Sequence, residues 1–283
     1  MTKYIAIAVV VCLIAFAVFI LYLFRKPVLK KLKPFPRKWR VFLNQRVRFY
    51  RNLDKKEKKR FQQRIQRFLN RVTITGIETE VTLEDRLLVA ASGIIPTFGF
   101  EAWNHYPRLK EVLLYKGNFS RGQFGLKGDD SSASGMVGGG FLSGKLLLSR
   151  PSLERGFKTF GPDNVGIHEF VHLLDMADGA VDGVPEYFLE NTYVLPWVEM
   201  MRSEMEAIER GRSDIGAYAT TNKAEFLAVA SEYFFSQPDK FAEKHPKIFA
   251  LMEEIFEQDL DEDGGIGTVD GNDILSKIVQ EKN

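Results

Sequence analysis

The sequence predicts an α+β domain behind a single N-terminal transmembrane helix. Three observations predict it. The run from Ile5 to Phe24 holds 20 residues without a charge. Short apolar runs of strand length follow, and segments with apolar residues at helical spacing alternate with them. The chain has 283 residues, 45% of them hydrophobic and 12% aromatic, which is too apolar for a disordered chain and enough for a core.

The N-terminal run is long enough to cross the hydrocarbon core of a membrane as a helix. It ends in bulky residues followed by Arg25 and Lys26, so it lacks the small-residue cleavage site of a secretory signal peptide. A cleaved signal and a buried helix are the alternatives. Cations follow the run in excess, and the positive-inside rule then predicts a single-pass protein of the cell membrane with a cytoplasmic C-terminal domain.

Charge is segregated along the chain, although the formal net charge is only +2. Residues 25–71 hold 19 Lys and Arg against two acidic residues, whereas residues 72–283 hold 19 basic and 35 acidic residues. A basic segment beside a membrane span favours contact with an anionic lipid bilayer, and direct binding of nucleic acid is not expected. Apolar residues from Phe61 to Val72 recur at helical spacing, which predicts a helix that packs on the body.

The next elements alternate between strand and helix. Val72–Val81 alternates in the manner of a strand, and Leu83–Ile95 has helical apolar spacing. Val112–Tyr115 and Lys145–Ser149 are short apolar runs that fit strands. Ser120–Gly144 holds eight glycines without periodicity, which predicts a long loop; it lacks the Lys and Ser/Thr of a nucleotide-binding phosphate loop.

The residues that carry chemistry lie in the sequence HEFVH, at His168, Glu169 and His172. Positions i and i+4 of a helix share a face, so both imidazoles can bind one zinc ion. Glu169 can reach a metal-bound water and act as its general base. The only cysteine is Cys12, so a metal site built from cysteines is excluded and carboxylates are left as further ligands.

A catalytic zinc needs a third protein ligand, and two acids compete for that role. Asp178 lies six residues after His172, which is the spacing of metzincins. Glu225 lies on a second and very apolar helical segment, where a buried acid needs a partner. Glu232 shares a face with Glu225 on that segment, at i and i+7.

These segments resemble the Mlc titration factor A family of zinc peptidases, whose catalytic domain is similar to that of anthrax lethal factor. The matching segments are IHEFVHLLD (Ile167–Asp175), DGAVDGVP (Asp178–Pro185), YATTN (Tyr218–Asn222) and AEFLAVASEYFF (Ala224–Phe235). The resemblance covers about residues 35–255. It implies an α+β, zincin-like metallopeptidase domain of the gluzincin type.

The resemblance implies that His168, His172 and Glu225 bind the zinc ion and that Glu169 is the catalytic base. It also implies that Tyr218 hydrogen-bonds the oxyanion of the tetrahedral intermediate; a core tyrosine is the alternative. The expected activity is the hydrolysis of peptide or protein substrates. The family is named for binding a glucose-responsive transcriptional repressor, so sequestration of a transcriptional regulator is the alternative function.

Three further expectations concern the surroundings of the metal. Asp175 lies one turn after His172 and is expected to orient a ligand imidazole, with helix capping or a surface contact as alternatives. Glu232 is expected to support the site from the same face as Glu225. Lys145–Ser149 is expected to supply an edge strand against which an extended peptide pairs.

The C-terminal tail departs from the family pattern and predicts a calcium site. Residues 259–270 fit the 12-residue loop of an EF-hand, between helices expected at Ile248–Phe256 and Ile274–Val279. The expected ligands are Asp259, Asp261, Asp263, the carbonyl of Gly265, and Asp270. Asp270 replaces the usual glutamate at position 12, which weakens calcium binding and favours Mg²⁺. A solvated acidic tail is the alternative.

The sequence therefore predicts four parts. They are a transmembrane anchor (1–24), a basic juxtamembrane and helical segment (25–71), a zinc peptidase domain (72–256), and an EF-hand-like loop with a C-terminal helix (257–283).

Overall fold

The computed structural model describes residues 32–101, 106–120, 132–133, 135–137, 144–158, 161–185, 188–189, 191–260 and 266–267. The chain divides into two compact units, Met1–Pro34 and Phe35–Asn283. The predicted transmembrane run Ile5–Phe24 lies outside the described residues and stays a prediction. Within the described ranges, no helix combines the length and apolar character needed to cross a membrane.

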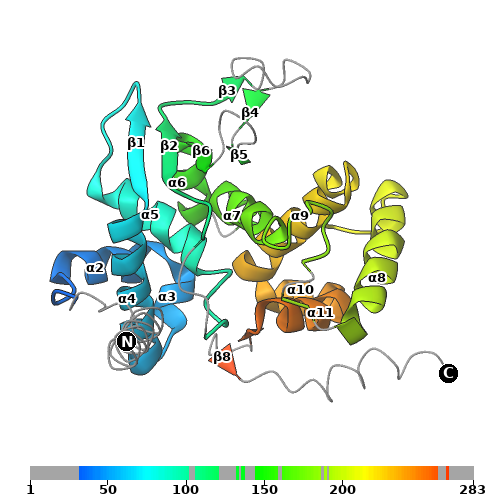
Figure 1. The fold of residues 1–283 in the computed structure, drawn as a ribbon. Coiled ribbons are helices and arrows are strands. Elements are labelled where there is room, and N and C mark those ends of the chain that lie inside the picture. Colours follow the sequence, from blue (N-terminus) through cyan, green and yellow to red (C-terminus); the bar gives the residue numbers. More distant parts are fainter. Residues whose placement is uncertain are drawn as a thin grey trace, which may run out of the picture. The chain divides into compact units, whose positions relative to one another are not determined.

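The second unit has the predicted α+β class, with a four-stranded sheet of order β1-β2-β6-β5 (Figure 1). The strands are β1 (Thr73–Ile77), β2 (Glu111–Tyr115), β6 (Lys145–Ser149) and β5 (Gly135–Val137). The first three are parallel, with Ile74 beside Val112 and Val112 beside Leu146. All three of these side chains are buried, so the sheet forms part of the core.

The expectation that Lys145–Ser149 forms an edge strand is wrong. β6 lies between β2 and β5 and is hydrogen-bonded on both sides. β5 pairs antiparallel with β6 and comes from the glycine-rich segment predicted to be a loop. The short strands β3 (Phe119–Ser120) and β4 (Ser132–Ala133) also lie in or beside that segment. Glycine-rich sequence lacks the alternation that indicates a strand, so only the pairing partner reveals β5.

Residues 37–71 of the basic segment lie in the second unit and form the helices α2 (Arg37–Arg46), α3 (Arg48–Asn52) and α4 (Lys55–Arg71). The start of α4 is a capping box, in which Asp54 accepts from the Glu57 backbone N–H at 2.7 Å and Glu57 accepts from the Asp54 N–H at 3.0 Å. The apolar stripe of α4, which includes Phe61 and Ile65, is buried. The helix therefore packs on the body, as its spacing predicts.

The helices that follow carry the candidate site. They are α5 (Leu83–Ile94), α6 (Arg150–Lys158), α7 (Val165–Asp175), α8 (Asn191–Glu209), the short 3₁₀ helix η3 (Ala217–Thr220), α9 (Lys223–Ser236), α10 (Pro238–Lys244) and α11 (Pro246–Phe256). In Figure 1, α7 lies between the sheet and α9, and it contacts α9, β5 and β6. This central position places α7 at the edge of the sheet that β5 forms.

Close packing against α5 holds α7 in place. A Cβ atom at Gly166 would lie 2.1 Å from the hydroxyl oxygen of Ser92, and one at Gly93 would lie 2.8 Å from the ring of Phe170. Both helices therefore need glycine at their crossing, because any side chain would push them apart. The Ser92 hydroxyl donates to the Leu88 carbonyl at 3.0 Å and leaves no buried polar group there unsatisfied.

The described part of the predicted calcium loop consists of two short paired strands. β7 (Asp259–Leu260) pairs antiparallel with β8 (Ile266–Gly267). The helix expected to enter the loop is α11, which ends at Phe256 as predicted and is followed by Glu257 in the left-handed conformation (φ 48°). Residues 261–265 and 268–283 lie outside the described residues, so the calcium site stays a prediction, as does the helix at Ile274–Val279.

Candidate metal centre

Helix α7 begins at a side-chain cap that also ties it to α9. The side-chain oxygen of Asn164 accepts from the Ile167 backbone N–H at 3.2 Å, which satisfies one of the free donors of the first turn. The backbone N–H of Asn164 donates to the Glu232 carboxylate on α9. The start of the helix that carries HEFVH is therefore joined to the helix that carries Glu225.

The structure brings the three predicted zinc ligands together. The Nε2 atoms of His168 and His172 lie 3.2 Å apart. The Oε2 atom of Glu225 lies 3.0 Å from Nε2 of His168 and 3.4 Å from Nε2 of His172. Among the described residues, this is the one group of three or more His, Cys, Asp or Glu side chains placed to hold a metal ion.

The pKa values of this cluster reflect its crowding with carboxylates. Burial alone would lower the pKa of His168, but its hydrogen bonds to Glu225 and Glu232 outweigh burial and raise that pKa well above its ordinary value. Burial would raise the pKa of Glu225, but the hydrogen bonds from His168 and His172 hold it well below its ordinary value. The cluster thus stabilises positive charge at its centre.

Glu232 contacts His168 at the ring nitrogen that faces away from Glu225. Its Oε1 atom lies 2.7 Å from Nδ1 of His168, on the ring edge opposite Glu225. The side chain is buried, and its other oxygen accepts from the Asn164 backbone. Glu232 therefore fixes both the His168 ring and the start of α7, as a carboxylate that supports a metal-bound histidine does.

Glu169 is a buried acid beside the cluster. Its Oε2 atom is buried and has no hydrogen-bond partner among the described residues. Burial raises the pKa of Glu169 above its ordinary value, although the neighbouring histidines oppose that rise. A buried carboxylate with an unused oxygen and a raised pKa is suited to take up a proton.

Tyr218 lies on η3 at the rim of the cluster. Its hydroxyl donates to Oε1 of Glu225 at 3.4 Å, and its ring centroid lies 6.1 Å from that of His168. The side chain is 48% exposed, which excludes the alternative of a core tyrosine. The hydroxyl thus lies where it can donate to a group bound at the metal site.

Asp175 lies on the same helix but does not bond to an imidazole. Both of its carboxylate oxygens accept from the Gly183 backbone N–H, at 3.0 and 3.1 Å, while the buried Nδ1 of His172 has no partner among the described residues. Burial raises the pKa of Asp175 to about 6. Asp175 therefore fixes the loop after α7, which differs from the expected role of orienting a ligand.

That loop supports the start of α9. Gly183 has φ of +76°, and a Cβ atom there would lie 2.2 Å from the Lys223 carbonyl oxygen. Its own carbonyl accepts from the indole N–H of Trp197 at 2.7 Å. Asp175 and Trp197 thus hold Gly183 against the turn from which Glu225 projects. Asp178, the alternative third ligand, is exposed, accepts from the Ala180 N–H at 2.9 Å, and is outside the cluster.

The residues present fit a zinc ion. Two imidazole nitrogens and one carboxylate oxygen form a ligand set of catalytic zinc sites, and ligand atoms around a tetrahedral zinc are roughly 3.4 Å apart. The three pairs measured here are 3.0, 3.2 and 3.4 Å apart. Three acids, Glu169, Glu225 and Glu232, surround the two imidazoles, so a divalent cation would offset their charge.

Sequence reasoning missed the residues that position the site through the backbone. Asn164 caps α7, and the side chain of Asn222 accepts from the Glu225 N–H at 2.9 Å and caps α9. An Asn directly before an apolar helical run is a recognisable cap, so both could have been found. Gly183 could not, because its role depends on a contact with Lys223 that no local pattern predicts.

This chain is similar to a described metallopeptidase family and to proteins named Mlc titration factor A. A family described as glucose-regulated metallo-peptidase M90 matches residues 23–257. An uncharacterized protein of Synechocystis sp. is 28% identical over 237 residues, which cover 79% of this chain and 85% of that protein. Mlc titration factor A of Salmonella arizonae is 28% identical over 224 residues (74% and 86%), and that of Serratia proteamaculans is 30% identical over 162 residues (53% and 60%).

Proposed function

Because this chain belongs to the glucose-regulated metallo-peptidase M90 family, we propose that it hydrolyses peptide bonds with a zinc ion held by His168, His172 and Glu225. The observation that carries the proposal is the convergence of these three side chains, whose ligand atoms all lie within 4.8 Å of one another. They come from two helices that are tied together by Glu232, so the ligand set is pre-organised.

A zinc ion bound there would supply Lewis acidity, which lowers the pKa of a water molecule and polarises a peptide carbonyl. The protein's own part begins with Glu169. Its buried carboxylate accepts the proton of the attacking water and later donates a proton to the leaving amine. The raised pKa of Glu169 suits both steps, because the group must take up a proton and release it.

Tyr218 supplies a hydrogen-bond donor to the negative charge that develops on the carbonyl oxygen. Its exposed hydroxyl lies at the rim of the cluster, within 3.4 Å of Glu225. A neutral donor at this point stabilises the transition state more than the substrate, because the charge forms only during the reaction.

The substrate is a peptide or protein in an extended conformation. The strand proposed to pair with it is β5 rather than Lys145–Ser149, since β5 is the edge strand of the described sheet and contacts α7. An extended segment can pair with the free backbone groups of an edge strand, which presents its peptide bonds to the site at regular spacing.

We also propose that the run Ile5–Phe24 anchors the chain in the cell membrane, with the peptidase unit in the cytoplasm. Its length and the cations that follow it support this proposal. The enzyme would then act on substrates near the membrane surface. Calcium binding at residues 259–270 is a separate proposal that the peptidase activity does not require.

A second function has support from the relatives. Several of them are named Mlc titration factor A, which describes titration of another protein rather than hydrolysis. By this proposal the chain would sequester a transcriptional regulator. Glu169 favours the peptidase, since a buried acid with an unused oxygen costs stability that a purely binding protein need not accept.

Cleavage of a peptide library by the purified full chain in neutral detergent tests the proposal. Cleavage should stop when a zinc chelator is added and return on addition of Zn²⁺ in slight excess. Failure of the zinc-loaded chain to cleave the library, or cleavage that persists after the metal is removed, would reject the peptidase proposal and favour sequestration.

A further inference from the structure

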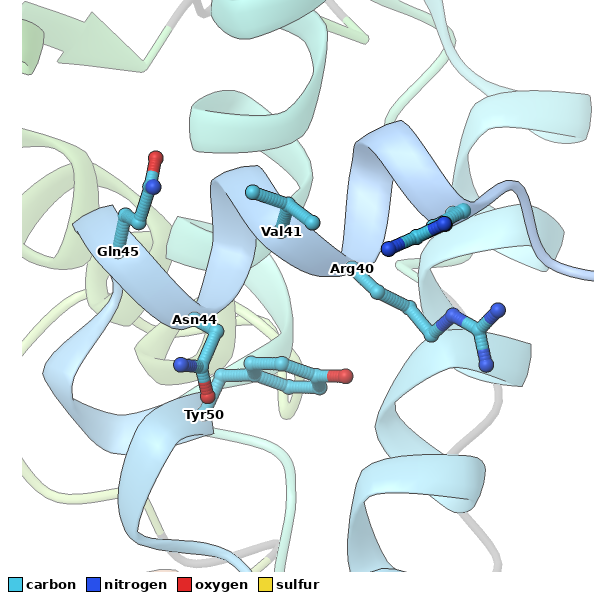
Figure 2. A pocket seen from close by; sticks show the side chains of 6 residues that line it. Arg40, Val41, Asn44, Gln45 and Tyr50 are labelled. Atoms are coloured by element: carbon cyan, nitrogen blue, oxygen red, sulfur yellow. The ribbon is translucent and has the colours of Figure 1, made fainter.

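A cleft far from the metal ligands in sequence opens between α2 and α3. It has a volume of about 430 Å³ and is lined by Arg37, Arg40, Val41, Asn44, Gln45 and Tyr50. Four of these residues follow the spacing i, i+3, i+4 and i+7, so they form one face of α2. In Figure 2, Asn44 lies beside the Tyr50 ring, and the phenol oxygen points to the side on which Arg40 lies.

The cleft carries positive charge that the described part of the chain does not neutralise. Arg37 and Arg40 are exposed, and neither forms an ion pair with a described carboxylate. Among the residues that the structure describes, no acid lines the cleft. A third cation lies next to it, since the ammonium group of Lys58 is 5.7 Å from the centroid of the Tyr50 ring. Guanidinium groups form paired hydrogen bonds with phosphate oxygens, so two of them on one helix face suit a phosphate.

Tyr50 adds a buried donor at the base of the cleft. Its hydroxyl oxygen accepts from the Gln62 side chain at 2.7 Å, and its own proton has no acceptor among the described residues. Burial raises the pKa of Tyr50, so the phenol keeps that proton at neutral pH. The side-chain amides of Asn44 and Gln45 can donate as well. The lining therefore offers two cations and three donors, which together match a ligand with several negatively charged oxygens.

We propose that this cleft binds a phosphate group, and that the headgroup of an anionic lipid is its favoured source. Val41 supports a lipid over a free ion, because this apolar side chain is 47% exposed and lines the cleft together with the arginines. An apolar side chain beside cations is typical of surfaces that enter the headgroup region. The residues that line the cleft also follow the predicted transmembrane run closely in the sequence. A chain anchored by that run would therefore hold them near a bilayer.

Calorimetric titration of the full chain in neutral detergent tests this proposal. The probes are dihexanoyl phosphatidic acid and inorganic phosphate. The wild type should bind the lipid saturably, and the double variant Arg37→Gln plus Arg40→Gln should bind it at least about tenfold more weakly, since it loses two charge-assisted contacts. The matched control is Arg202→Gln plus Arg212→Gln, which removes two exposed arginines elsewhere and should bind as the wild type does.

The two probes separate the sources of phosphate. Tighter binding of phosphatidic acid than of inorganic phosphate assigns the cleft to a lipid headgroup, and equal binding assigns it to free phosphate; either result supports a phosphate site. The proposal is overturned if neither probe binds saturably, if the Arg37/Arg40 variant binds as tightly as the wild type, or if the control loses as much affinity. Circular dichroism of both variants should match the wild type, because all four arginines are exposed.

Discussion

Glu232 lies 2.7 Å from Nδ1 of His168, on the opposite side of the imidazole from Glu225. Two carboxylates of α9 therefore hold one ring of α7 at both nitrogens. A proton on Nδ1, donated to Glu232, leaves the lone pair of Nε2 free to face the metal position. The orientation of His168 thus depends on an acid that does not itself contact that position.

Replacing Glu232 with Gln should weaken zinc binding by about 10–100-fold. A carboxylate accepts from both His168 and the Asn164 N–H, whereas an amide has only one oxygen to offer. Competition with a chromophoric zinc chelator measures the affinity. Glu243→Gln, an exposed substitution on α10, is the matched control and should leave it unchanged. Equal affinity in both variants would show that Glu232 does not position the ligand.

Replacing Tyr218 with Phe should lower the rate of peptide hydrolysis by about 10²–10³-fold, because one donor to the oxyanion is lost. Zinc content and thermal stability should not change, since the side chain is 48% exposed. Turnover and metal content of the same preparation give the comparison. Turnover at the wild-type rate in Tyr218→Phe would show that Tyr218 does not stabilise the oxyanion.

Gly183→Ala should destabilise the protein more than Gly211→Ala. Both glycines have positive φ, +76° and +65°, so each alanine costs about 1–2 kcal/mol in the backbone. Only at Gly183 would the new Cβ meet the Lys223 carbonyl, at 2.2 Å, whereas Gly211 faces open space. That clash should add about 1–3 kcal/mol and displace Glu225, with loss of zinc. Urea unfolding measures the loss of stability in each variant. Equal losses would contradict the proposal that Gly183 supports the start of α9.

His245 should make stability depend on pH. It forms ion pairs with Glu204 at 3.1 Å and Asp214 at 2.8 Å. Burial lowers the pKa of His245, but the two carboxylates outweigh burial and raise it above 6.5. Because the folded pKa is raised, this stabilisation is fully present below pH 6.5 and is lost as pH rises through the folded pKa.

His245→Gln should therefore cost more stability at about pH 5.5 than at about pH 9. Asp214 stays ionised at both values: burial raises its pKa, but Lys244 and His245 hold it well below its ordinary value. Urea unfolding of wild type and variant at the two pH values supplies the difference. The same cost at both values would mean that the imidazole is not charged in the folded protein.

The parts of the site that depend on local periodicity could be predicted from the sequence. His168 and His172 share a helix face by spacing alone. Glu225 lies 57 residues from His168, and the family resemblance is what assigns it as a ligand, since Asp178 lies at the spacing of metzincins and competes for the same role. The backbone contacts of Asp175 and Gly183 could not be predicted, because they arise only when α7 and α9 meet.

The order of the strands in the sheet could not be predicted from the sequence either. β1, β2 and β6 have apolar runs that indicate strands, and the structure places strands there. β5 has no such run, because Gly135 and its neighbours form a strand only by pairing with β6. The sequence therefore predicts the edge of the sheet at Lys145–Ser149, which lies one strand in from the edge that β5 forms. Local propensity predicts which segments are strands but not their order in a sheet.

The most direct test of the account is the Glu169→Gln variant, assayed for zinc content and peptide cleavage in one preparation. Glutamine keeps the size of the buried side chain but cannot accept the proton, so we expect one zinc per chain, as in the wild type, and a loss of cleavage of about 10²–10⁴-fold. The control variant Glu243→Gln should retain both the zinc ion and the wild-type rate of cleavage. Cleavage at the wild-type rate by zinc-loaded Glu169→Gln would contradict the proposed mechanism.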